Sequence, residues 1–311
     1  MPIVKRIVLL FLLFSGSVIF SQDYQRVDSI VSKYPKRFSS TVKLAKLISN
    51  DFKDEADKVR AAFFWIADNV KYDPKEGDGF SFEYGDKAEY LEKEKKYNDK
   101  LSKRVISKGV AVCEGYSTLF SRVCRDLGIK SKVITGASKT TVKDIGKRFY
   151  SDHAWNIVEI DNTSYLVDVT WGAGTYGPRF QKELDNSFYL TPPEFFIKRH
   201  YPENYVDALL KVNFSKENFS NAPLVYGNDF SLISPLNGVI QKNQKVVKFS
   251  FTCKPGTYTI DYDFDLKQNS LGDIKSLDDK LEFEIDLKNI GRARELTLYF
   301  DYKAVAMFRL K

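Results

Sequence analysis

A cysteine, a histidine and an aspartate follow one another in an order that suits nucleophilic catalysis. Cys113 stands at the predicted start of a helix, where backbone N–H groups and the helix dipole favour a thiolate, the form of cysteine that attacks a carbonyl carbon. His153, one of only two histidines in the 311-residue chain, opens a predicted strand, and Asp168 lies in the next one. Each residue type alone is more often structural than catalytic, so the prediction depends on whether the fold brings them together.

The two strands that carry the histidine and the aspartate are predicted to form a hairpin. They span residues 153–160 and 164–171, and Asp161-Asn162 supplies a two-residue turn. This register puts His153, Trp155 and Asp168 on one face of the sheet, and diagonal neighbours there are roughly 5–8 Å apart between Cβ atoms. Asp168 can then hold the imidazole of His153 in one tautomer and stabilise its charged form.

The cysteine needs a helix that begins at residue 113, and the pattern after it predicts one. Apolar residues recur at helical spacing from Tyr116 to Leu127, and Gly128 is a stop signal. A strand over 129–135 and a polar loop over 137–152 then lead back to His153. A helix beginning at Asp54 as N-cap, two helical pieces over 22–50, a surface excursion with some helix over 75–104 and a wrapping segment over 172–210 complete this part.

The last hundred residues have a different sequence pattern. Alternating, aromatic and β-branched segments follow one another without helices, at residues 246–253, 257–264, 281–287, 295–302 and 304–310. They predict a β-sandwich-like domain over 211–311. The fold class is therefore α+β, with a core over 22–210 and an all-β C-terminal domain.

The N-terminus predicts export. Lys5-Arg6, an apolar run from Ile7 to Phe14 and small residues before Ser21 indicate a signal peptide over 1–21, which makes the protein periplasmic or secreted. The run is too short to span a bilayer, although an N-terminal anchor or a buried helix is the alternative, and no later segment is predicted to cross a membrane. Removing Lys5 and Arg6 leaves 46 basic against 41 acidic residues, so +7 becomes +5. The basic residues are dispersed, so no nucleic-acid partner is expected.

Three ordered motifs resemble the transglutaminase-like superfamily of papain-like cysteine enzymes. They are Gly-Val-Ala-Val-Cys113-Glu-Gly-Tyr, His153-Ala-Trp-Asn and Leu-Val-Asp168-Val-Thr-Trp171-Gly-Ala-Gly. Lys139 and the segment Phe-Phe-Ile-Lys-Arg-His200-Tyr-Pro-Glu resemble its kyphoscoliosis-peptidase branch, and the resemblance covers about residues 55–210. It implies a papain-like core with Cys113 as nucleophile, His153 as base and Asp168 as the acid that orients the base.

The leading hypothesis is an exported thiol enzyme that acts through a thioester on amide bonds of a protein or peptide, with the cell envelope as a candidate location of the substrate. Water as acceptor makes it a protease or amidase, which we prefer, and a lysine amine makes it a cross-linking transferase. The alternative of another class is a binding or scaffolding module with a vestigial triad. A third interpretation makes the β domain a cell-wall or glycan binder. No cofactor and no metal ion are expected, because no calcium loop is present and three cysteines cannot make a cysteine-rich zinc site.

The remaining chemistry-bearing residues have structural alternatives. Trp155 and Trp171 flank the motifs and are predicted to bind substrate, although packing around the hairpin would also explain them. His200 is predicted to be structural. Cys124 lies on the apolar helix face and is predicted to be inert, and a disulfide between Cys124 and Cys253 is not expected.

Overall fold

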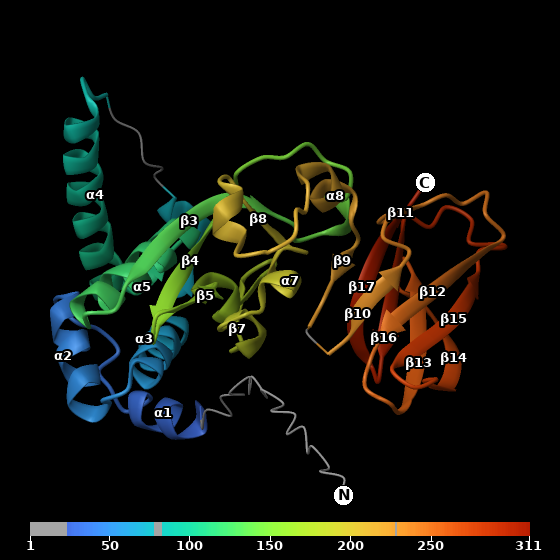
Figure 1. Ribbon diagram of the computed structural model, residues 1–311, viewed down its shortest axis with the longest axis horizontal. Coiled ribbons are helices and arrows are strands. Elements are labelled where there is room, and N and C mark those ends of the chain that lie inside the picture. The colour runs from blue at the N-terminus through green and yellow to red at the C-terminus, as the bar shows by residue number, and fades with distance from the viewer. Residues whose placement is uncertain (1–23, 78–82, 228) are drawn as a thin grey trace, which may run out of the picture.

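The computed structural model describes residues 24–77, 83–227 and 229–311, so the predicted signal peptide lies outside the described residues. Two parts are visible, a helix-rich core with a small sheet and a C-terminal β domain (Figure 1). The predicted α+β class, with a mixed helix-and-sheet core and an all-β sandwich-like C-terminal part, is confirmed. Within the described ranges, no helix is both long and apolar enough to cross a bilayer.

Three helices open the core: α1 (Tyr24–Val31), α2 (Thr41–Asp51) and α3 (Glu55–Asn69). They match the predicted helical pieces, although Asp54 at the N-cap of α3 makes no side-chain cap bond. Arg60 of α3 is fully buried and donates to both carboxylate oxygens of Asp28, at 2.8 and 2.6 Å. Such a bidentate pair fixes the orientation of α1 on α3, because guanidinium and carboxylate match at two points.

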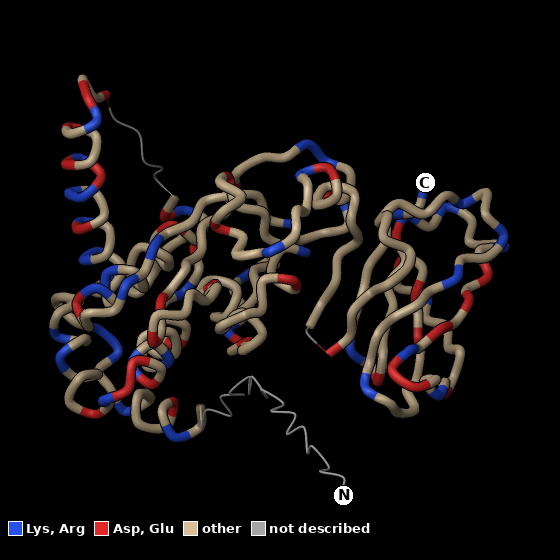
Figure 2. Tube along the Cα trace, in the orientation of Figure 1, with Lys and Arg blue, Asp and Glu red and all other residues tan. Residues whose placement is uncertain are grey.

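Helix α4 (Lys87–Lys108) is longer and more regular than the predicted surface excursion over 75–104. Its N-terminal half has few buried residues, and basic and acidic residues alternate along it (Figure 2). Local interactions stabilise it instead: Asp86 caps the amide of Glu89 at 2.8 Å, and Lys93 pairs with Glu89 one turn away. Gly109, at φ 71°, ends the helix in the left-handed conformation that glycine adopts without strain. Apolar periodicity cannot detect a helix whose stability is local.

The site is built around helix α5 (Cys113–Asp126) and a four-stranded antiparallel sheet in the order β5-β4-β3-β8. The strands are β3 (Ser131–Ser138), β4 (His153–Ile160), β5 (Thr163–Val167) and β8 (His200–Pro202). The apolar side chains of α5 pack against β4 and the preceding helices. Strand β1 (Lys71–Tyr72) pairs in parallel with β2 (Val110–Ala111), immediately before α5.

The predicted hairpin has the predicted register but a shorter second strand. Ile160 pairs with Thr163 and Asn156 with Val167, and there β5 ends. The prediction that the strand continues to 171 is wrong, because the side chain of Asp168 caps a short helix, α6 (Val169–Gly172), and turns the chain. Shorter elements complete the core: η1 (Pro74–Glu76), η2 (Val142–Asp144), β6 (Gly174–Tyr176), β7 (Phe180–Lys182), η3 (Asn186–Phe188), α7 (Pro193–Phe196), η4 (Tyr205–Ala208) and α8 (Lys216–Asn221).

The C-terminal domain consists of two sheets packed face to face. One has the order β10-β12-β15 and the other β11-β17-β16-β13-β14, with β9 pairing β17. Their strands are β9 (Leu224–Val225), β10 (Ser231–Ser234), β11 (Val239–Ile240), β12 (Val246–Thr252), β13 (Thr257–Phe264), β14 (Lys267–Lys275), β15 (Lys280–Asp286), β16 (Glu295–Phe300) and β17 (Lys303–Leu310). Phe251 meets Phe300 across the interface, with ring centroids 4.9 Å apart. Strand β14 is polar and exposed at a sheet edge, which explains why alternation did not predict it.

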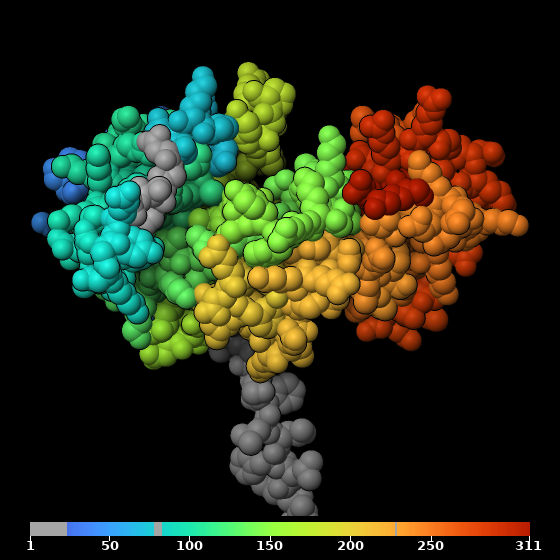
Figure 3. All heavy atoms as spheres, turned by 90° about the horizontal axis from the view of Figure 1, so that it is seen from above, coloured from blue at the N-terminus to red at the C-terminus, as the bar shows by residue number. Residues whose placement is uncertain are grey.

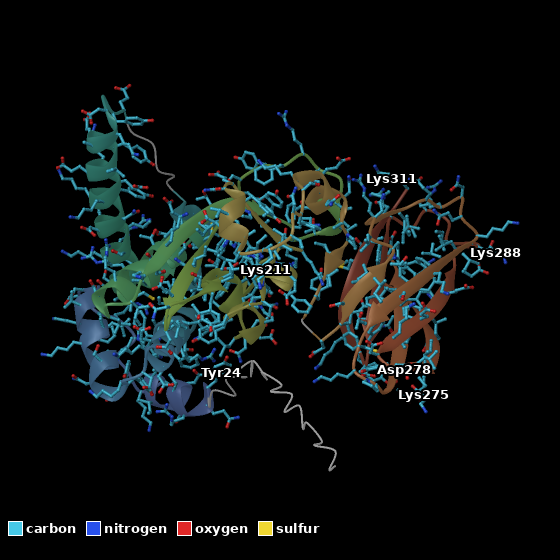
Figure 4. The ribbon with its side chains drawn as sticks, viewed as in Figure 1. Tyr24, Lys211, Lys275, Asp278, Lys288 and Lys311 are labelled. Atoms are coloured by element: carbon cyan, nitrogen blue, oxygen red, sulfur yellow. The ribbon has the colours of Figure 1, made fainter. Side chains whose placement is uncertain are left out.

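The two parts contact each other directly. Arg309 of β17 donates to the carbonyl of Ile145 at 3.2 Å, and the space-filling view shows the orange-to-red domain against the green and yellow segments of the core (Figure 3). On the core side, Lys139 is buried and donates to the carbonyls of Phe219 and Ala222, at 2.7 and 2.9 Å, at the end of α8. Lys275 and Lys288, by contrast, are exposed and extend outward from the β domain, Lys275 at its lower end and Lys288 at its right-hand edge (Figure 4).

Candidate active site

Cys113 is the first residue of α5, as predicted, and is partly exposed. Val112 precedes it as N-cap and has no side chain that can satisfy the free amides of the first turn. Those amides and the helix dipole place partial positive charge beside the sulfur. Gly115 lets α5 approach β2, because a Cβ there would lie 2.7 Å from the Cβ of Ala111. Close packing of α5 on β2 therefore fixes where the thiol lies.

Tyr72 is a neighbour of the thiol that the sequence did not predict. It lies on β1, opposite Ala111, and its ring is 5.5 Å from that of Tyr176. Burial is the main cause that raises the pKa of Tyr72, and the proximity of Cys113 adds to it. Tyr72 and the exposed Tyr176 therefore form an aromatic surface beside the nucleophile. The short parallel pairing of β1 with β2 was the missing signal, because two residues are too few to show alternation.

His153 begins β4 and joins the nucleophile to the acid. Its Nε2 lies 2.7 Å from Oδ2 of Asp168, and Cys113 is close enough to contribute to raising the pKa of the imidazole. Since Nε2 is engaged, Nδ1 is the nitrogen left for the sulfur. Burial by itself lowers the pKa of His153, but Asp168, with a smaller contribution from Cys113, raises it to about 10. The protonated imidazolium is thus the favoured form at neutral pH.

Asp168 is fully buried and uses all of its hydrogen-bonding capacity. Its Oδ1 accepts the amides of Thr170 and Trp171, at 2.9 and 3.1 Å, and thereby caps α6. Its own amide donates to the carbonyl of Phe188 at 2.9 Å. Burial opposes the charge, but the bond to His153 and the other donors hold the pKa of this carboxyl well below its usual range. The residue is therefore ionised and fixed in place.

His200 is the second functional residue that the sequence did not place at the site. Strand β8 pairs its backbone with Ser138, and its Nε2 lies 3.0 Å from the same Oδ2 of Asp168. Burial lowers the pKa of His200 to about 4, so the ring is neutral. The sequence offered one signal for placing His200 at the site: it is the second of the two histidines and lies in an aromatic-rich segment.

The tryptophans predicted to contact substrate differ in exposure. Trp155 has 1% of its surface exposed, and its ring packs against Phe196 at 5.7 Å and His200 at 5.3 Å, so it supports the histidines from behind. Trp171 is half-buried and its ring lies 5.3 Å from that of His153. Of the two, Trp171 is the one with surface left for a ligand.

The other two cysteines lie away from the site. Cys124 is buried in the helical core and Cys253 in the β domain, and all three cysteines are free thiols in the structure. Burial raises the pKa of the Cys124 thiol, which suits an inert side chain.

His153, Asp168 and His200 are also the residues that could hold a metal ion, because their ligand atoms lie within 4.8 Å of one another. The two Nε2–Oδ2 distances of 2.7 and 3.0 Å, however, are those of direct hydrogen bonds. Donor atoms around a tetrahedral zinc ion stand about 3.3 Å apart. The cluster therefore fits shared protons better than a shared ion.

Comparisons with known proteins find relatives of part of this chain. Residues 42–169 match the sequence profile of the Transglutaminase-like superfamily. Kyphoscoliosis peptidase of Homo sapiens is 29% identical over 208 residues, covering 64% of this chain and 29% of the human protein. Hillarin of Drosophila melanogaster is 30% identical over 128 residues, covering 36% of this chain and 16% of hillarin. A solved structure, the crystal structure of a TGase, has a TM-score of 0.30 and 18% identity, covering 57% of this chain and 40% of that chain. The chain thus spans less than a third of the length of these curated relatives.

Proposed function

We propose that this chain, whose residues 42–169 form a transglutaminase-like superfamily core, is a thiol enzyme that acts on amide bonds. The observation that carries the proposal is the connected series Cys113, His153 and Asp168, with the thiol at a helix start and the Nε2–Oδ2 distance at 2.7 Å. A thiolate paired with a protonated imidazole, and a buried ionised carboxylate behind them, are the parts that acyl transfer through a thioester needs.

The first half of the reaction follows from these parts. The Cys113 sulfur attacks the carbonyl carbon of the substrate, and the carbonyl oxygen takes up the negative charge. The backbone N–H of Cys113 is one donor that can stabilise this oxyanion. The C–N bond then breaks, and His153 gives its Nδ1 proton to the leaving amine, while Asp168 keeps the ring in position through Nε2. The product is a thioester on Cys113 and a free amine.

The acceptor decides the second half. His153, now neutral, removes a proton from water or from an amine, which attacks the thioester and regenerates the thiolate and the imidazolium. We favour water, which makes the protein a protease or amidase, and the printed name of the human relative, a peptidase, supports hydrolysis. A lysine amine as acceptor would make it a cross-linking transferase.

The side chains around the thiol suggest how substrate is held. Tyr72, Tyr176 and Trp171 leave aromatic surface beside Cys113 and His153. Aromatic faces bind extended peptides and apolar side chains through area and shape. We therefore propose a protein or peptide substrate. Because residues 1–21 predict export of the protein, we propose that this substrate lies in the cell envelope or in the medium.

Mass spectrometry tests the function. The purified protein and its Cys113→Ala variant are incubated with an unfolded protein substrate and with an envelope protein fraction, with and without an added primary amine. Cys113-dependent new termini support hydrolysis, and Cys113-dependent incorporation of the amine supports transfer. The Cys124→Ala variant, which changes a buried thiol away from the site, is the matched control. A covalent adduct or cleavage that survives in Cys113→Ala overturns the proposal, and so does the absence of both reactions in the unmodified protein.

A further inference from the structure

One carboxylate oxygen at the site serves two histidines. Oδ2 of Asp168 lies 2.7 Å from Nε2 of His153 and 3.0 Å from Nε2 of His200. The triad uses only the first contact. His200 is 1% exposed, so it is neither a surface residue nor a group that meets the substrate.

The surroundings of His200 fix where its proton lies. Three charged groups face it: Asp168 favours its protonation, whereas His153 and Arg199 oppose it. Its Nδ1 is buried and has no hydrogen-bond partner in the described residues. A proton on Nδ1 would leave a buried donor unpaired, whereas a proton on Nε2 is donated to Asp168. The favoured form is therefore the neutral Nε2–H tautomer.

The ring itself cannot rotate away from the carboxylate. It stacks on Phe196, with centroids 4.0 Å apart and planes at 19°, and it meets Trp171 at 4.3 Å. The pairing of β8 with β3 holds its backbone. His200 thus presents an N–H donor at a fixed position.

We propose that His200 is a positioning residue that donates its Nε2–H to Oδ2 of Asp168, fixes that carboxylate for His153, and limits the pull of the carboxylate on the His153 proton. Together with the Nε2–H of His153 on Oδ2 and the two amides on Oδ1, this donor fills the four acceptor positions of Asp168. The donor lowers the charge density on Oδ2, which leaves His153 able to release its proton to a leaving amine. The inference rests on the proposed function for its catalytic meaning, but the hydrogen bond and its electrostatic effect exist without substrate.

Two substitutions separate donation from packing. His200→Gln keeps an N–H donor near the position of Nε2, whereas His200→Phe keeps an aromatic ring and removes the donor. Because the chain has only two histidines, ¹⁵N-imidazole NMR of the full protein resolves both. In each variant His153 is the one histidine that remains, so its signal is assigned directly. The measurements are the tautomer of His200 in the unmodified protein and the titration midpoint of His153 in all three proteins. The rate of the amide-bond reaction is a separate readout.

The expected results are specific. His200 shows the neutral Nε2–H pattern at pH 7. His200→Phe moves the His153 midpoint upward by about half a pH unit or more, because Asp168 loses a donor, while His200→Gln leaves it near the original value. The kcat of the Phe variant falls about tenfold to a hundredfold and that of the Gln variant stays within about threefold, with little change in KM.

Other results overturn the inference. They are a charged or Nδ1-protonated His200 at pH 7, or midpoints that move equally in the two variants. If neither variant folds, the tautomer in the unmodified protein decides alone. If the unmodified protein shows no amide-bond reaction, the proposed function fails, while the NMR titration still decides the role of His200.

Discussion

His153 and Asp168 are joined by a 2.7 Å hydrogen bond although they belong to different kinds of structure, one to the first residue of a strand and the other to the cap of a helix. The strand places the imidazole and the cap fixes the carboxylate. Since the cap turns the chain directly after Val167, Asp168 leaves the sheet and its carboxylate is free to meet the ring. The chemistry of the site thus depends on where a strand stops.

Thiol labelling should distinguish Cys113 from the other two cysteines. Cys113 is partly exposed at a helix start, whereas Cys124 and Cys253 have 0% and 6% of their surfaces exposed. Iodoacetamide should therefore add one carbamidomethyl group to the native protein, and three after denaturation, as counted by intact-mass spectrometry. The native adduct should disappear in Cys113→Ala and persist in Cys124→Ala. A second native adduct forming at a similar rate would contradict the assignment.

Asp168→Asn should remove the activity and keep the fold. The asparagine carbonyl can still accept the amides of Thr170 and Trp171, because asparagine is a good N-cap. Its NH₂ group, however, would face the Nε2 donor of His153 and favour the wrong tautomer. We expect kcat/KM to fall by about 10³–10⁴-fold with a modest change in melting temperature.

The matched control for that change is Asp185→Asn. Asp185 caps η3 by accepting the amide of Ser187 at 2.9 Å, without a histidine. It should leave kcat/KM unchanged. Comparable losses in the two variants would show that capping, and not the bond to His153, matters for the rate.

Mild acid should destabilise the protein through His200. Burial lowers its pKa from the usual 6.5 to about 4, so the unfolded chain binds a proton that the folded protein does not. The free energy of unfolding should therefore fall as the pH drops from 6.5 towards 4, by at most about 1.4 kcal/mol per pH unit from this residue. His153 adds no slope in that window, because it is protonated in both states below 6.5. Urea titrations at several pH values should show a shallower slope in His200→Gln, and equal slopes would refute the assignment.

Two buried bases should have opposing effects in alkali. The pKa of His153 is raised to about 10, so its contribution to stability is complete below 6.5 and is lost as the pH rises through 10. The pKa of Lys139 is lowered by burial, and further by Arg199, to about 7, so stability rises between 7 and the usual lysine value of 10.5. The free energy of unfolding should consequently change little between pH 7 and 10.

Lys139→Met should reveal the loss of stability that His153 causes as the pH rises. It leaves the carbonyls of Phe219 and Ala222 without this donor, which costs about 1–3 kcal/mol at pH 7, and stability should then decline steeply towards pH 10. Lys132→Met removes an exposed lysine paired with Asp207 and is the control, with little expected change at any pH. If the free energy of unfolding of Lys139→Met does not change between pH 7 and 10, the two residues do not have opposing effects.

The sequence predicted those parts of the site that local patterns encode. Helical spacing put Cys113 at the start of α5, and the two-residue turn gave the register in which Asn156 pairs with Val167. It did not predict that Asp168 is a cap, because a capping aspartate and the end of a strand look alike in a short apolar segment. It also assigned His200 a structural role, because the contact with Asp168 depends on the pairing of β8 with β3, more than 60 residues away along the chain at its nearest end.

The capping role of Asp168 bears on how such chains diverge. A copy that no longer catalyses anything would still need this carboxylate to end β5 and start α6, so drift would spare it. The sulfur of Cys113 supports no comparable element, because the backbone of α5 forms without it. In a survey of related genes, the residue at the cysteine position would therefore distinguish catalytically active homologues from inactive ones. An aspartate at position 168 would indicate only that the fold is retained.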